Sequence, residues 1–185
     1  MRIIAGKAGR LAIKVPQAVA RPTTDFVRQA IFSILGDRVD DSRVLDLFAG
    51  SGAIGLEALS RGASTCIFVD EHRQADATIR QNLEKTKLSG GRVVKSDVQS
   101  FLKRDTASYD LIFADPPYWQ HHGDKDHIGD LLGSGLVAAR LAANGCFVAE
   151  ISAHQPSPDG GVLSLIDRRE YGGSAVLLYA HAANA

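Results

Sequence analysis

The chain contains very little cysteine, with only Cys66 and Cys146 among its 185 residues. Two cysteines this far apart offer neither the close ligand pairs of a zinc site nor a disulfide framework. Each cysteine lies inside an apolar run, so we expect two buried thiols on strands and no bound metal.

A long hydrophobic run is also absent. The most apolar stretches are interrupted by Arg140 and Asn144 or by His181, and they fall short of the roughly 18 residues that cross a bilayer. The first seven residues carry charge without the apolar segment of a secretory signal. We therefore expect a soluble, cytoplasmic protein, and a monomer.

The chain has no excess charge of either sign, because 21 lysines and arginines balance 21 aspartates and glutamates. This balance hides a polarity, since residues 1–28 hold six basic residues against the single acid Asp25, a net charge of +5. Clustered cations of this kind suit contacts with phosphates. The alternative is a solvent-exposed edge strand that carries charged side chains. The candidate RNA-binding residues are Arg2, Lys7, Arg10, Lys14, Arg21 and Arg28.

Apolar runs of strand length alternate with amphipathic stretches of helix length, which predicts an α/β fold with a mostly parallel, doubly wound sheet. We expect one domain, with a basic arm and helix in residues 1–36 and the core in residues 43–185. The predicted strands are Arg43–Phe48, Thr65–Asp70, Arg92–Lys95, Tyr109–Ala114 and Cys146–Ile151, followed by an antiparallel hairpin of Val162–Arg168 and Ala175–Ala180. The predicted helices are Asp25–Leu35, Ala53–Arg61, Arg73–Lys87, Val98–Lys103 and Asp130–Ala142.

A glycine-rich turn joins the first core strand to its helix, and Gly50, Gly52 and Gly55 fit the dinucleotide pattern G-x-G-x-x-G. The pattern alone does not choose between NAD and S-adenosylmethionine. Asp46 precedes the glycines on the strand, where a carboxylate attracts a cationic ligand and repels a pyrophosphate. Asp97, after the third strand, suits an adenine amine. Both acids favour S-adenosylmethionine.

The fourth core strand ends in Asp115-Pro116-Pro117-Tyr118. Ligands of open α/β sheets bind at the carboxyl ends of the strands. The prolines remove two N–H donors and leave carbonyl acceptors. The Asp115 carboxylate and the Pro116 carbonyl suit the two hydrogens of an exocyclic amine on a planar base, and Tyr118 suits stacking on that base. The motif therefore predicts methylation of a base amine.

These motifs, together with residues 2–6 and Arg21-Pro22-Thr23-Thr24-Asp25, resemble the bacterial 16S ribosomal RNA guanine-N2 methyltransferase D family over nearly the whole chain. The resemblance implies a Rossmann-like class I methyltransferase fold of seven strands, S-adenosylmethionine as cofactor and a guanine N2 amine of 16S rRNA, within a 30S subunit or an assembly intermediate, as substrate. It places catalysis at residues 115–118. It implies cofactor contacts at Thr23, Thr24, Asp46, Phe48, Ala49, Gly50, Ser51, Gly52, Asp70, Asp97 and Val98.

Three other functions remain open at this point. The first is a DNA adenine-N6 or cytosine-N4 methyltransferase, against which the small size of the chain counts. The second is a non-catalytic nucleic-acid-binding protein on the same fold, and the third is an NAD-dependent oxidoreductase. The histidines at 121, 122 and 127 lie in a polar segment that we expect to form a loop beside the substrate pocket and not a metal site.

Overall fold

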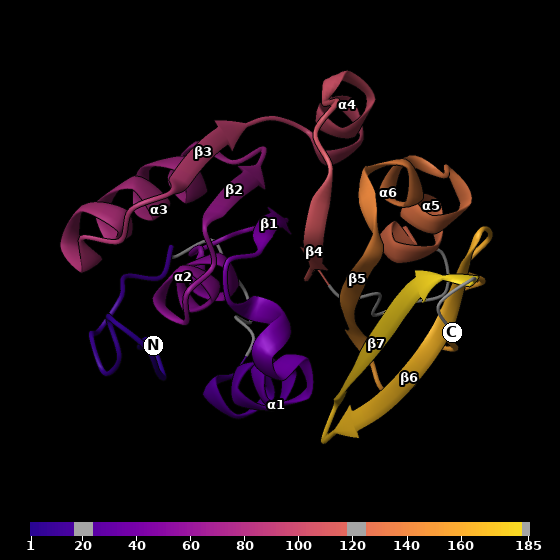
Figure 1. Ribbon diagram of the computed structural model, residues 1–185, viewed down its shortest axis with the longest axis horizontal. Helices are drawn as coiled ribbons and strands as arrows, with labels where there is room; N and C mark the ends of the chain where they lie inside the picture. Colours follow the sequence, from indigo (N-terminus) through magenta and orange to yellow (C-terminus); the bar gives the residue numbers. More distant parts are fainter. Residues whose placement is uncertain (17–23, 118–124, 183–185) are drawn as a thin grey trace. The chain divides into compact units, whose positions relative to one another are not determined.

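The computed structural model describes residues 1–16, 24–117 and 125–182. The chain forms two compact units, Met1–Val98 and Gln99–Ala185 (Figure 1). The predicted sites divide between them. The candidate cofactor residues and the basic arm belong to the first unit, and the Asp-Pro-Pro segment belongs to the second.

The first unit is built on three parallel strands in the order β3-β2-β1. β1 and β2 carry mostly buried apolar side chains, as expected for parallel strands covered by helices. The ring of Phe68 on β2 lies against the start of α2, and Ile79 of α3 lies beside it, so both helices pack on one face of these strands. The bounds are β1 Arg43–Leu47, α2 Ala53–Ser60, β2 Thr65–Asp70, α3 Arg73–Thr86 and β3 Gly91–Lys95.

The helix α1 spans Asp25–Leu35, as predicted, and a short 3₁₀ turn, η1, follows over Gly36–Val39. Thr24 caps α1 through its hydroxyl, which accepts a hydrogen bond from the Val27 amide at 3.2 Å. The helix ends at Gly36, which has a positive φ of 53°. The buried side of α1 carries the apolar residues that the periodicity predicts, and it also carries Arg28, which that pattern does not predict.

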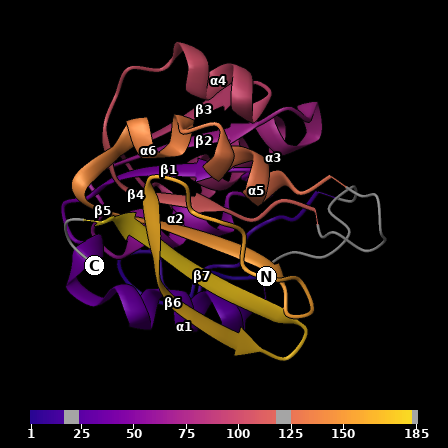
Figure 2. The same ribbon diagram turned by 90° about the vertical axis from the view of Figure 1, so that its right-hand side faces the viewer.

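The second unit holds strands in the order β4-β5-β7-β6, with β4 and β5 parallel and the last two pairings antiparallel. Figure 2 shows strand β7 between β5 and β6. The predicted hairpin is confirmed, with Gly172 and Gly173 at its turn. The bounds are α4 Val98–Arg104, β4 Tyr109–Ala114, α5 His127–Gly133, α6 Leu136–Arg140, β5 Leu141–Ser152, β6 Leu163–Tyr171 and β7 Ser174–His181.

One predicted element is wrong. The single helix expected over Asp130–Ala142 is two helices, because Gly135 adopts a left-handed conformation with φ of 69° and interrupts it. The strand after it is correspondingly longer than predicted and begins at Leu141.

In the described residues the two units together supply the seven strands of a mostly parallel sheet with a C-terminal antiparallel hairpin, so the predicted fold class is confirmed. Cys66 and Cys146 are buried free thiols on β2 and β5, also as predicted. None of the helices in the described ranges is long and apolar enough to span a membrane.

Candidate functional site

The loop after β1 is a tight, left-handed turn. Phe48, Gly50 and Gly52 have φ values of 57°, 54° and 76°, and the Gly52 amide donates to the Ala49 carbonyl at 2.6 Å. A side chain at Gly52 would be strained by this φ and would lie 3.2 Å from Ile79. The sequence therefore needs glycine at this position.

Asp46 lies on β1, before this loop, and is hydrogen-bonded to the helix that follows the loop. Its carboxyl oxygen Oδ2 accepts a hydrogen bond from the Gly55 amide at 2.9 Å, in the first turn of α2. Burial, the largest cause, and the nearby Asp70 carboxylate together raise the pKa of Asp46 to about 8, against the lowering effect of the Gly55 hydrogen bond. In dinucleotide-binding folds a pyrophosphate occupies such a helix N-terminus. Here Asp46 takes one of the amides of that N-terminus, which leaves fewer donors for a pyrophosphate such as that of NAD.

Asp70, at the end of β2, is tied to the same loop. Its Oδ2 accepts from the Gly50 amide at 2.9 Å, and its Oδ1 accepts from the His72 amide at 2.9 Å. The ring nitrogen Nδ1 of His72 lies 3.0 Å from the same Oδ1. A carboxylate offers about four acceptor positions, so these contacts orient Asp70 and still leave capacity for a ligand hydroxyl.

The third acid of the first unit follows β3. The Ser96 amide donates to the Asp70 carbonyl at 3.0 Å, which holds the ends of β2 and β3 together. Asp97 is exposed and Val98 is buried beside it. Asp46, Asp70 and Asp97 thus line the carboxyl-end side of three parallel strands. These acids fit S-adenosylmethionine, whose ammonium, ribose hydroxyls and adenine amine are all donors.

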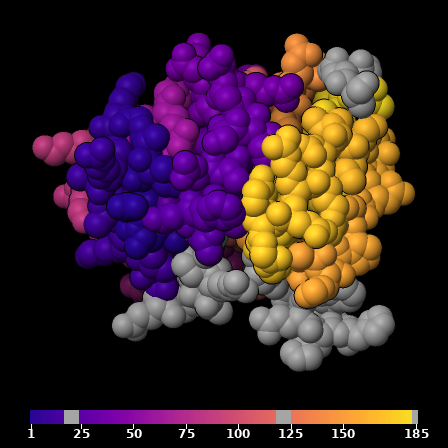
Figure 3. All heavy atoms as spheres, turned by 90° about the horizontal axis from the view of Figure 1, so that it is seen from below, coloured from indigo at the N-terminus to yellow at the C-terminus, as the bar shows by residue number. Residues whose placement is uncertain are grey.

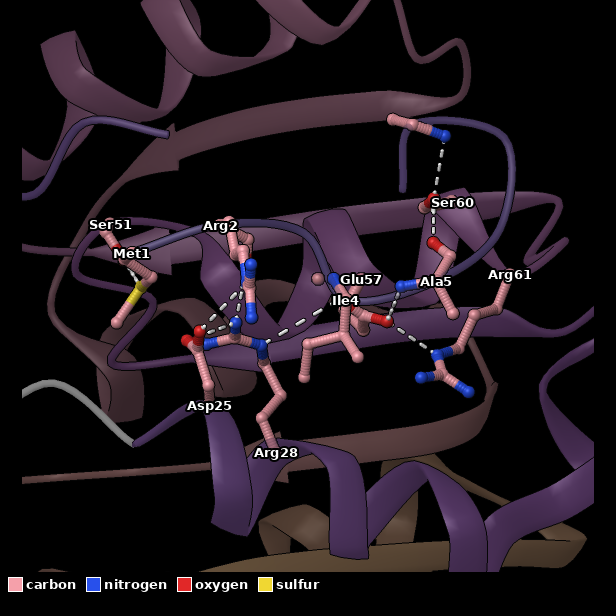
Figure 4. A network of polar contacts seen from close by, with 12 residues as sticks. Met1, Arg2, Ile4, Ala5, Asp25, Arg28, Ser51, Glu57, Ser60 and Arg61 are labelled. Carbon is pink, nitrogen blue, oxygen red and sulfur yellow. Dashed lines mark hydrogen bonds and ion pairs between the residues drawn. The ribbon is translucent and has the colours of Figure 1, made fainter. Parts of the chain in front are cut away.

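The N-terminal arm is fixed to α2 by a buried carboxylate that the sequence analysis missed (Figure 4). Glu57, fully buried on α2, accepts hydrogen bonds from the Ile4 amide at 2.7 Å and the Ala5 amide at 3.0 Å. It also accepts from Nε of Arg61 at 2.6 Å and lies 3.9 Å from Nε of Arg28. The arm is therefore held as part of the first unit through its own backbone.

Gly6 allows the arm to pass close to the end of α2. A Cβ atom at Gly6 would lie only 1.9 Å from the Ser60 carbonyl oxygen, and the φ of this residue is 78°. The Ser60 hydroxyl accepts from the Ala8 amide at 2.9 Å, and the Lys7 amide donates to the Ser60 carbonyl at 2.7 Å. Figure 3 shows the arm, in indigo, at the molecular surface.

Arg28 corrects the predicted set of RNA-binding residues. Its side chain is fully buried, donates to the Arg2 carbonyl and to Asp25, and belongs to the Glu57 cluster. A buried guanidinium in this position holds the arm and does not face a phosphate. Arg2, Lys7, Arg10 and Lys14 are exposed, while Arg21 lies outside the described residues.

Asn82 joins the arm to the glycine loop and was also missed. Its Oδ1 accepts from the Lys14 amide at 2.8 Å, and its Nδ2 donates to the carbonyls of Lys14 at 2.9 Å and Ser51 at 3.0 Å. The Ser51 hydroxyl donates to the sulfur of Met1 at 3.6 Å. The arm and the predicted cofactor loop are therefore joined at two places within the first unit.

The second unit carries the predicted catalytic segment directly after β4. Asp115 is half-buried, Pro116 is buried and Pro117 is exposed. Two predicted residues, the catalytic Tyr118 and the cofactor-binding Thr23, lie outside the described residues, and Thr24 is described only as the cap of α1. A pocket opens beside the segment. It is lined by Pro116, Pro117, Lys125, Asp126, His127, Ile128, Glu150, Ile151 and Gln155.

One wall of this pocket is fixed by hydrogen bonds. Asp126 caps α5 by accepting from the Gly129 amide at 2.9 Å, and the same oxygen accepts from the Gln155 side-chain amide at 3.1 Å. Arg168 of β6 in turn donates to the Gln155 carbonyl at 3.1 Å and to the Ala153 carbonyl at 2.9 Å. The segment around Gln155 is thus held against the start of α5.

Comparison with known proteins agrees with these features. The family described as "Conserved hypothetical protein 95" matches residues 1–180. "Putative rRNA methyltransferase YlbH" of Bacillus subtilis is 38% identical over 97% of this chain and 98% of its own length. "Ribosomal RNA small subunit methyltransferase D" of Escherichia coli is 40% identical over 64% of this chain and 60% of its own length.

The fold also matches solved structures. The structure titled "Putative methyltransferase yhhF from Escherichia coli" superimposes with a TM-score of 0.84 at 31% identity, covering 98% of this chain and 97% of that one. The class I methyltransferase fold that the motifs predict is therefore confirmed.

Proposed function

Because the chain belongs to the family described as conserved hypothetical protein 95, we propose that it is an S-adenosylmethionine-dependent methyltransferase acting on the N2 amine of a guanine in 16S rRNA. Two relatives, one named as a putative rRNA methyltransferase and one as a small-subunit rRNA methyltransferase, support rRNA as the substrate class. We further propose that the acceptor is the N2 amine of a guanine and that the substrate is the 30S subunit or an intermediate of its assembly.

The observation that carries the proposal is the Asp115-Pro116-Pro117 segment at the carboxyl end of β4, whose prolines line a pocket. An aromatic amine is a poor nucleophile because its lone pair is delocalised into the ring. The Asp115 carboxylate and the Pro116 carbonyl accept its two hydrogens and so favour a pyramidal nitrogen with a localised lone pair.

The first unit supplies the cofactor contacts. When bound, S-adenosylmethionine supplies a methyl group on a positively charged sulfur, which a nitrogen lone pair can attack. Asp70 accepts hydrogen bonds from the ribose hydroxyls, and Asp97 accepts one from the adenine amine. Asp46 holds the glycine loop, which Gly50 and Gly52 shape, by its hydrogen bond to the Gly55 amide. After transfer, the methylated nitrogen carries a positive charge and readily gives a proton to the Asp115 carboxylate.

The proposal is tested by replacing Asp115 with alanine. Asp115→Ala should abolish methyl transfer, because the nitrogen loses both an acceptor and a base, while the dissociation constant for S-adenosylmethionine stays near the wild-type value. Asp37, an exposed acid of η1, provides a matched control as Asp37→Ala. Full activity of Asp115→Ala on rRNA would contradict the mechanism.

A further inference from the structure

The pocket of the second unit is lined by two acids, Asp126, which caps α5, and Glu150, which the mechanism above does not use. Glu150 lies on β5, is only 3% exposed and lines the pocket together with Pro116 and Pro117. A carboxylate buried in the wall of a pocket is a candidate for contact with a ligand.

The strand register puts Glu150 next to the predicted catalytic acid. β4 and β5 are parallel, and Ala114 pairs with Ala149. Asp115 directly follows the last paired residue of β4, and Glu150 directly follows Ala149 on β5. Glu150 therefore lines the pocket together with the two prolines that come directly after Asp115.

We propose that Glu150 selects guanine in this pocket by accepting the hydrogen on guanine N1, an inference that rests on the proposed function. Guanine, adenine and cytosine all carry an exocyclic amine. In guanine a ring nitrogen next to this amine, N1, carries a hydrogen and is a donor. In adenine and cytosine the ring nitrogen beside the amine is an acceptor, which a carboxylate repels.

The rest of the pocket fits the same base edge. Lys125 and His127, from the segment that begins α5, also line it. Guanine presents the O6 acceptor on the other side of N1, and an ammonium or imidazole N–H is a suitable donor to it. The Glu150 carboxylate thus suits the N1–H donor of guanine, and Lys125 or His127 suits its O6 acceptor.

The test compares two bases that carry the same N2 amine. Full-length protein is given the rRNA substrate with either guanine or 2-aminopurine at the modified position. The N1 of 2-aminopurine has no hydrogen, so the wild type should methylate guanine at least about 100-fold more efficiently, as expected when a buried polar group loses its partner. Equal kcat/KM on the two bases would overturn the proposal.

Variants then assign this preference to Glu150. In Glu150→Gln the side chain keeps its size but also offers an N–H donor, so the ratio of kcat/KM on guanine to that on 2-aminopurine should fall at least about ten-fold. The control Glu84→Gln makes the same change at an exposed position of α3 and should leave the ratio unchanged. A purely structural role would lower both activities equally and keep the ratio, which would overturn the proposal.

Thermal unfolding and S-adenosylmethionine affinity are measured on each variant. If Glu150→Gln does not fold, Glu150→Asp replaces it. That variant shortens the side chain by one methylene, so the ratio of kcat/KM on guanine to that on 2-aminopurine should also fall. An unchanged ratio would contradict the proposal. If the wild type methylates no guanine in any RNA, the proposed function itself fails. If it methylates guanine and the ratio does not respond to residue 150, only the inference about Glu150 fails.

Discussion

The side-chain amide of Asn82 donates a hydrogen bond to the Ser51 carbonyl at 3.0 Å, and this bond joins α3 to the glycine loop. The same side chain exchanges two hydrogen bonds with the backbone of Lys14. One buried residue therefore contacts both the predicted cofactor loop and the end of the arm.

Replacing Asn82 with alanine should weaken S-adenosylmethionine binding. The change leaves the buried Ser51 carbonyl and the partly buried Lys14 backbone groups without this side-chain partner, at a cost of about 1–3 kcal/mol for a buried unsatisfied group. Isothermal titration calorimetry should show a dissociation constant raised at least ten-fold. The control is Gln81→Ala, whose exposed side chain accepts from the Lys14 ammonium. Equal affinities of the two variants would contradict the role of Asn82.

Replacing the Glu57 carboxylate should destabilise the protein and release the arm. Glu57→Gln removes the charge that faces buried Arg28, and breaking a buried ion pair costs about 3–5 kcal/mol. Urea unfolding should report this destabilisation, and trypsin should cleave faster at Lys7 and Arg10. Asp25→Asn changes a partly exposed acid of the same cluster, so it should cost less than about 1 kcal/mol. A wild-type unfolding midpoint for Glu57→Gln would refute this role.

Asp46 should make stability fall as the pH rises. Its pKa is raised from 3.8 to about 8 by burial, so the folded state keeps a proton that the unfolded state releases above pH 4. This contribution is complete below the unfolded pKa and declines by up to about 1.4 kcal/mol per pH unit until the pH passes the folded pKa. Asp46→Asn should remove it. The difference in unfolding free energy between the two proteins is measured from pH 4 to pH 9, and a difference that does not vary with pH would contradict the assignment.

The exposed cations of the arm should set the salt dependence of RNA binding. Neutralising Lys7, Arg10 and Lys14 together as glutamines should lower the slope of log K against log salt concentration by about 0.7–0.9 for each phosphate that the arm no longer neutralises. Filter binding over a range of salt concentrations gives the slope. The control neutralises three exposed cations of the second half of α3 and its C-cap, Arg80, Lys85 and Lys87. If the arm variant keeps the wild-type slope, the arm does not bind phosphate.

The sequence predicts the strands and most helices because hydrophobic periodicity and glycine turns are local signals. The helix α1 begins after Thr24 and ends at Gly36, as expected. The turn between β6 and β7 lies at Gly172 and Gly173, also as expected. The break at Gly135 was missed because the apolar pattern continues on both sides of it. Burial of Arg28 was missed for another reason. Its guanidinium donates to the Arg2 carbonyl and lies 3.9 Å from Glu57, both distant in sequence, and no local pattern reveals such partners.

The three buried polar residues that sequence reasoning missed do leave a signal in retrospect. Glu57 is the only charged residue of the apolar helix α2, and Glu150 interrupts the apolar strand β5. Asn82 follows Ala75 and Ile79 on the buried face of α3. A polar residue at a position where the periodicity demands an apolar one marks a buried contact, but only the fold shows what it contacts.

The proposed reaction is tested most directly by following the methyl group. The protein is incubated in parallel with labelled S-adenosylmethionine and naked 16S rRNA, 30S subunits, 50S subunits or DNA, and each product is digested to nucleosides. We predict label in N2-methylguanosine from the 16S rRNA or 30S samples and none from DNA. Label in N6-methyladenine or N4-methylcytosine of DNA, or no transfer to any nucleic acid by protein that binds S-adenosylmethionine, would contradict the proposed function.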